Sequence, residues 1–167
     1  MTLLSDSNDW WTEDHLYKEL IKWAKVNPLI DAAASKENTK CDFYFSKEDD
    51  ALTQEWIIPR AFPFVNYADI WLNPPLGKGM TKKFVLKAIE QYKKYNMNIL
   101  MLLPAGVIPR AYFQPIWDNF AYHYTVDRPV EIKPIIPRPK FLYKGEKAKW
   151  SARNDYIAVL LKKVNLK

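Results

Sequence analysis

The spacing of apolar and polar residues along the chain predicts an α/β fold. Apolar residues recur at helical spacing in the segments 12–26 and 82–95, with Thr12 as the expected N-cap of the first helix. Short apolar runs typical of buried strands occupy 28–33, 43–45, 70–72, 98–104, 122–126 and 156–162. A helical turn is predicted at 49–56 and a short helix, broken by Pro115, at 109–120. An irregular crossing is predicted at 57–67 and a proline-rich surface loop or ribbon at 129–149.

The order of these segments predicts how the sheet is built. Strands alternate with helices in the middle of the chain and follow one another closely near its end. This order favours a mostly parallel sheet with an antiparallel edge formed near the C-terminus. We expect residues 1–167 to form one domain, since the chain has neither an internal repeat nor a linker, and residues 1–9 to be flexible.

Composition narrows the classes of protein to which this chain can belong. Its 167 residues are 49% hydrophobic and 26% charged, which is typical of a globular protein, and no apolar run approaches membrane-spanning length. A single cysteine cannot form an internal disulfide, and only two histidines, far apart, predict no metal site. The net charge of +6 is compatible with a nucleic-acid partner but does not require one. We expect a cytoplasmic protein with no membrane partner.

The segment 69–80 carries the most specific candidate chemistry. The apolar run 70–72 stops at Asn73-Pro74-Pro75, where successive prolines cannot donate to a sheet ladder. Ligands of open α/β sheets bind just beyond strand ends of this kind. The Asn73 side-chain oxygen and the Pro74 carbonyl are acceptors whose geometry Pro75 would fix, and two acceptors converging on an aromatic amine would favour its attack on an electrophilic methyl group. The alternative is that the triplet only ends a strand.

Several separated motifs occur in one order along the chain. They are Trp11-Thr12, Asp31-Ala32-Ala33-Ala34-Ser35 with Asn38, Asp50-Ala51-Leu52, Asn73-Pro74-Pro75, Leu102-Leu103-Pro104 and Arg138-Pro139-Lys140-Phe141. Over residues 10–160, this order resembles the phage-type (Dam-like) DNA adenine methyltransferase family. The resemblance implies a Rossmann-like fold of the S-adenosylmethionine (SAM) dependent methyltransferases, encoded by a phage or mobile element or associated with a host nucleoid.

The resemblance also implies residue roles. SAM would contact Trp11, Thr12, Asp31, Ala32, Ala33, Ser35, Asn38, Asp50 and Asn73. Asn73, Pro74, Pro75 and Leu76 would form the catalytic loop, with Leu76 where the family usually has an aromatic residue. Adenine in a duplex would have to be flipped out of the stack, at a cost of roughly a few kcal/mol.

Basic residues predict the contacts to DNA phosphates. They are Lys78, Lys133, Arg138, Lys140, Lys144 and Lys147. Each role has a plainer alternative, because Asp31 can cap a turn, Trp11 can be core, and the basic segment can be a solvated face. The function has alternatives too. Leucine at position 76 would suit a catalytically degenerate nucleic-acid-binding relative, and the same loop chemistry serves RNA, cytosine and protein glutamine.

Overall fold

The computed structural model describes residues 10–58, 68–77, 79–122 and 129–164. Three helices form within these ranges: α1 (Asp14–Ala24), α2 (Met80–Tyr95) and α3 (Gln114–Tyr122), with short 3₁₀ turns at Ala105–Val107 and Ala111–Phe113. The strands are β1 (Trp10–Trp11), β2 (Pro28–Asp31), β3 (Phe43–Tyr44), β4 (Asp69–Leu72), β5 (Ile99–Pro104), β6 (Val130–Ile135), β7 (Leu142–Tyr143), β8 (Glu146–Lys147) and β9 (Tyr156–Leu161). None of the helices in these ranges is long and apolar enough to span a membrane.

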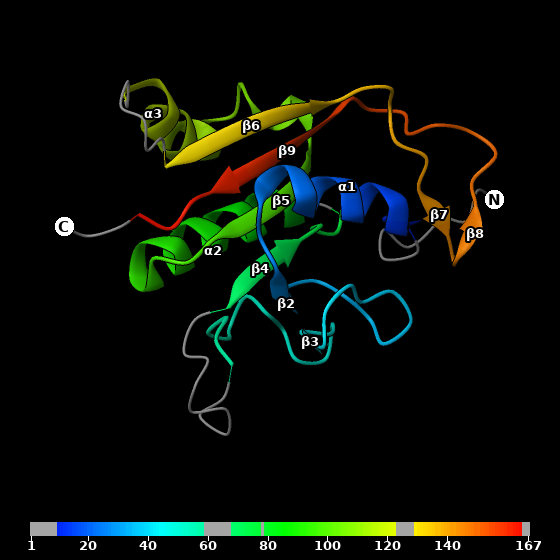
Figure 1. The fold of residues 1–167 in the computed structure, drawn as a ribbon, viewed down its shortest axis with the longest axis horizontal. Helices are drawn as coiled ribbons and strands as arrows, with labels where there is room; N and C mark the ends of the chain where they lie inside the picture. Colours follow the sequence, from blue (N-terminus) through cyan, green and yellow to red (C-terminus); the bar gives the residue numbers. More distant parts are fainter. Residues whose placement is uncertain (1–9, 59–67, 78, 123–128, 165–167) are drawn as a thin grey trace.

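The main sheet has the order β3-β2-β4-β5-β9-β6. The strands from β3 to β5 are parallel, whereas β9 is antiparallel to both of its neighbours. In Figure 1 the arrowheads of β4 and β6 therefore point to one side of the molecule and that of β9 points to the other. The predicted mostly parallel sheet with an antiparallel C-terminal strand is confirmed.

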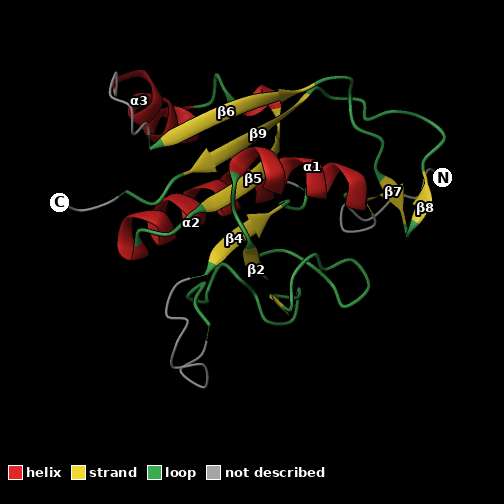
Figure 2. Ribbon diagram, in the orientation of Figure 1, coloured by secondary structure: helices red, strands yellow, loops and turns green. Residues whose placement is uncertain are grey.

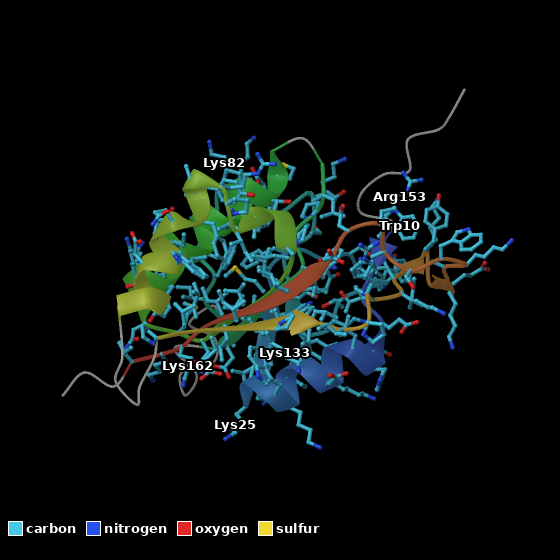
Figure 3. All side chains as sticks on the ribbon, turned by 90° about the horizontal axis from the view of Figure 1, so that it is seen from above. Trp10, Lys25, Lys82, Lys133, Arg153 and Lys162 are labelled. Atoms are coloured by element: carbon cyan, nitrogen blue, oxygen red, sulfur yellow. The ribbon has the colours of Figure 1, made fainter. Side chains whose placement is uncertain are left out.

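Helices cover both faces of this sheet. Alternate residues of β5 belong to different cores, since Ile99 and Met101 pack in the cluster that includes α2, while Leu100 and Leu102 pack with Leu20 of α1. Figure 3 shows the sheet nearly edge-on, with α1 on one side and α2 and α3 on the other. Burial on both faces explains why the sequence of β5 is apolar throughout.

Two expectations about helix ends are wrong. Glu13, not Thr12, is the N-cap of α1, and it makes no side-chain cap hydrogen bond. Thr12 is buried and its hydroxyl is used elsewhere, as described below. Pro115 does not break α3, because it stands in the first turn, where a backbone N–H has no intrahelical acceptor.

The segment 129–149 was predicted to be a surface loop or ribbon, and it forms strands in two different sheets. Its first part is β6, an edge strand of the main sheet, where the missing N–H of Pro134 is tolerated. Its second part is the β7–β8 hairpin, which lies apart from the main sheet in Figure 2. This hairpin pairs with β1 in a separate three-stranded sheet. Within the helical turn predicted at 49–56, residues 49–53 form turns. Of the strand predicted at 122–126, Tyr122 ends α3 and the rest lies outside the described residues, as do residues 59–67 of the predicted crossing.

Candidate active site

A cavity of about 470 Å³ lies at the carboxyl ends of the central parallel strands. In the sheet, β3 lies on one side of β2 and β4 lies on the other, so the direction in which the chain adds strands reverses at β2. Such a reversal is where open α/β sheets bind ligands. The cavity is lined by residues 32–35 and Asn38 after β2, residues 45–48, Asp50 and Ala51 after β3, residues 73–76 after β4, Met80 and Phe84 of α2, and Trp10, Phe141 and Tyr156.

Asn73 directly follows β4, and its amide is held in one orientation. Its Nδ2 group donates a hydrogen bond of 3.0 Å to the hydroxyl oxygen of Thr12, a side chain that is only 3% exposed. Among the described residues, no donor bonds to Asn73 Oδ1. Because Asn73 lines the cavity, this oxygen remains available there as an acceptor.

The loop after β2 is fixed by its own hydrogen bonds. The carboxylate of Asp31 accepts the backbone N–H groups of Ala33 at 3.2 Å and Lys40 at 3.1 Å. Asn38 Oδ1 accepts the N–H of Ser35 at 2.7 Å, so this side chain holds the loop. Burial raises the pKa of Asp31 to about 6, although both backbone bonds act in the opposite direction. The wall of the cavity is therefore largely preformed.

Asp49 and Asp50 are adjacent but make different contacts. Asp49 accepts hydrogen bonds from the backbone and hydroxyl of Ser46, and these bonds lower its pKa. Asp50 has a left-handed backbone with φ of 50° and lines the cavity, and its carboxylate bonds to no other described side chain. Asp50 is therefore the acidic group of this pair that is available to a ligand.

Three residues predicted to contact a cofactor do not line the cavity. Asp31 is 2% exposed and acts through the loop, and Thr12 lies behind Asn73. Trp10 lines the cavity in place of Trp11, because successive side chains of a strand point to opposite faces. The ring of Trp11 packs against Gly145, where an added Cβ would lie 2.9 Å from Trp11 Cζ3. In a strand of two residues, the sequence does not indicate which side chain faces the cavity.

The predicted DNA-contacting residues fall into separate groups. Lys140, Lys144 and Lys147 are exposed on or beside the β7–β8 hairpin. Lys133 instead stands on β6, on the side of the sheet covered by α1 (Figure 3). The Nε atom of Arg138 donates to Asp155 Oδ1 at 2.6 Å, and Lys78 lies outside the described residues.

Acidic, histidine and cysteine side chains of the described ranges form no group of three or more that could hold a metal ion.

Comparison with known proteins identifies a family and two similar phage proteins. The family model for DNA N-6-adenine-methyltransferase (Dam) matches residues 1–126. A DNA N-6-adenine-methyltransferase of Escherichia phage T1 is 41% identical over 76 residues, which cover 46% of this chain and 27% of the phage protein. One from Haemophilus phage HP1 is 28% identical over 102 residues, covering 61% of this chain and 53% of that protein. The chain thus spans only about a quarter to a half of these curated relatives.

Proposed function

Because this chain belongs to the DNA N-6-adenine-methyltransferase (Dam) family, we propose that it transfers a methyl group from SAM to the 6-amino group of adenine in DNA. One observation carries the proposal: Asn73 and the loop 32–35 line the same cavity at the point where the strand order reverses. The names of the two phage relatives support DNA adenine as the substrate over RNA, cytosine or protein glutamine.

The cavity fits SAM in size and in chemistry. Its volume of about 470 Å³ falls within the roughly 300–1,000 Å³ common for small-molecule sites. Ala32 and Ala33 leave room beside the end of β2, and the Asp50 carboxylate can accept hydrogen bonds from sugar hydroxyls. When bound, SAM supplies an electrophilic methyl group on a positively charged sulfur. Asp31 and Asn38 act as positioning residues that hold the loop around it.

Asn73 would orient the reacting amine of the substrate. The lone pair of an aromatic amine is delocalised into the ring, which makes the amine a weak nucleophile. The Thr12 hydroxyl accepts a hydrogen bond from Asn73 Nδ2, which leaves Oδ1 as the acceptor end of an amide that lines the cavity, and Pro75 restricts the backbone that presents the Pro74 carbonyl. Two fixed acceptors orient the amine and stabilise the positive charge that develops on it.

The flipped adenine also needs an apolar contact. Leu76 lines the mouth of the cavity and is 42% exposed, but it has no aromatic face. Trp10 lines the same cavity, is 36% exposed and packs on Tyr143 with ring centroids 5.1 Å apart. We assign to Trp10 the stacking contact that Leu76 cannot make, a contact worth about 1–3 kcal/mol per base.

Methyl transfer from labelled SAM to separate samples of DNA, RNA and protein tests the proposal. We expect label in DNA only, and calorimetry should detect SAM binding without DNA. Label confined to RNA or protein would overturn the choice of substrate. No heat on titration with SAM, with DNA binding retained, would identify a degenerate binding protein instead.

A further inference from the structure

A second pocket, of about 440 Å³, lies beside the first and contains three arginine residues. Arg110, Arg138 and Arg153 line it, and Asp155 is the one acidic residue among its described lining. Thr81, Tyr112 and Asn154 add neutral polar groups. The pocket is therefore positively charged and rich in hydrogen-bond donors, which suits an anion.

The three arginines are not equivalent. Arg138 is bonded within the protein, since its Nε donates to Asp155 at 2.6 Å and its Nη1 donates to the carbonyl of Arg153 at 3.2 Å. Arg110 and Arg153 are exposed, and their guanidinium groups make no hydrogen bond or ion pair with the described residues. Two guanidinium groups thus remain available to a ligand, while Arg138 positions the segment that carries one of them.

The backbone around this pocket is well fixed. The N–H of Ala105, just after β5, donates to the carbonyl of Asp155 at 2.8 Å and joins the two sides of the pocket. Arg110 lies between two 3₁₀ turns, where its N–H donates to Val107 and its carbonyl accepts the N–H of Phe113. A ligand would meet guanidinium groups attached to an ordered backbone.

The pocket adjoins the proposed methyl-transfer site. Thr81 follows Met80 and Asp155 precedes Tyr156, so neighbouring residues in the chain line the two cavities. In Figure 3, Arg153 lies at the same end of the molecule as Trp10, and Lys162 lies at the opposite end. A polymer whose base enters the first cavity would pass its backbone along this edge.

We propose that Arg110 and Arg153 bind two neighbouring backbone phosphates of DNA beside the target adenine, one phosphate each. The identity of the ligand rests on the proposed function. A flipped nucleotide rotates about its own backbone, so its flanking phosphates must be held while the base leaves the stack. Guanidinium groups suit this task, because they can bind phosphate oxygens through two parallel hydrogen bonds.

The salt dependence of DNA binding counts phosphate contacts directly. Fluorescence anisotropy with a short duplex over a series of NaCl concentrations compares the wild type with the Arg110→Gln/Arg153→Gln double variant. We expect the slope of log K against log salt to weaken by about 0.9 per lost contact, hence by about 1.8 in the double variant. Lys163→Gln is the matched control, because it removes an exposed charge just beyond the C-terminal end of β9, whereas Asp155 and Tyr156, which line the two cavities, lie at the other end of that strand.

Two further arms identify the ligand. Replacing single phosphates of the duplex with neutral methylphosphonates should weaken wild-type binding at one or two positions, and the double variant should lose nothing more there. Asp155→Asn should tighten DNA binding, because it removes the carboxylate found among the described residues of the pocket. The proposal would be overturned if the methylphosphonates and the double variant weakened DNA binding additively, or if the double variant had an unchanged salt slope. Saturation of the pocket by inorganic phosphate in NMR titrations with no change in the DNA slope would also overturn it.

Failure of this proposal differs from failure of the proposed function. If the wild type methylates DNA but the double variant has an unchanged salt slope, the phosphate site alone is refuted. If the wild type binds DNA without methylating it, the proposed function is refuted. The salt slopes of DNA binding then still decide whether the two arginines contact phosphate.

Discussion

Substituting Thr12 with valine tests whether a buried hydroxyl orients the proposed catalytic amide. Valine has nearly the shape of threonine but offers no acceptor to Asn73 Nδ2, which bonds to Thr12 Oγ1 at 3.0 Å in the native protein. Without it, the amide can turn and present Nδ2, a donor, to the substrate amine. A buried hydrogen-bonding group that loses its partner costs about 1–3 kcal/mol. If the Asn73 amide loses this much of its preference for the active orientation, kcat should fall about fivefold to about 150-fold.

The assay separates orientation of the amide from contact with the cofactor. Steady-state kinetics with SAM and DNA should show lower kcat for Thr12→Val, while calorimetry gives an unchanged Kd for SAM. Thr12→Ser keeps the hydroxyl and should retain most of the activity. A folded Thr12→Val variant with wild-type kcat would refute the reasoning. Weakened SAM binding at unchanged kcat would instead support the direct cofactor contact expected from sequence.

Three other predictions concern stability. Burial raises the pKa of Asp31 from 3.8 to about 6, so the native state binds this proton more tightly than the unfolded chain. The stability contributed by this proton is present below about pH 4 and is lost as the pH rises through about 6. Urea unfolding at a series of pH values should show this loss of unfolding free energy in the wild type but not in Asp31→Asn. Gly145→Ala should destabilise the protein by about 1 kcal/mol or more, because φ is +86° and the added Cβ would meet a tryptophan ring, whereas Gly106→Ala has open space and should be nearly neutral in thermal unfolding. Gln91→Leu leaves the buried Trp56 N–H, now 2.8 Å from Gln91 Oε1, without an acceptor, and denaturant titration should show a loss of about 1–3 kcal/mol.

Elements with a strong local pattern were predictable from sequence. The strands at 70–72 and 98–104 are apolar because both faces are covered, and that pattern is visible without knowledge of their partners. The sheet formed by β1, β7 and β8 had no such signal, since each strand has two residues and exists only through pairings such as Trp10 with Tyr143. The edge strand β6 was misread because Pro134 is typical of loops.

The candidate site was predictable in part for a related reason. Asn73 and the loop after Asp31 follow strand ends, where α/β sheets place ligands, so their position was open to inference. The contact between Thr12 and Asn73 joins residues 61 positions apart, and nothing local to either residue indicates it. The arginine pocket likewise forms from separate segments, and of its three described arginines the sequence indicated only Arg138, which is paired with Asp155.

Mass spectrometry of nucleosides from DNA treated with SAM and either wild-type protein or Asn73→Ala tests the central claim most directly. We expect N6-methyladenine with the wild type and none with Asn73→Ala, while that variant still binds SAM in calorimetry. N6-methyladenine at the wild-type level with the variant, or methylation of cytosine instead of adenine by the wild type, would contradict the account.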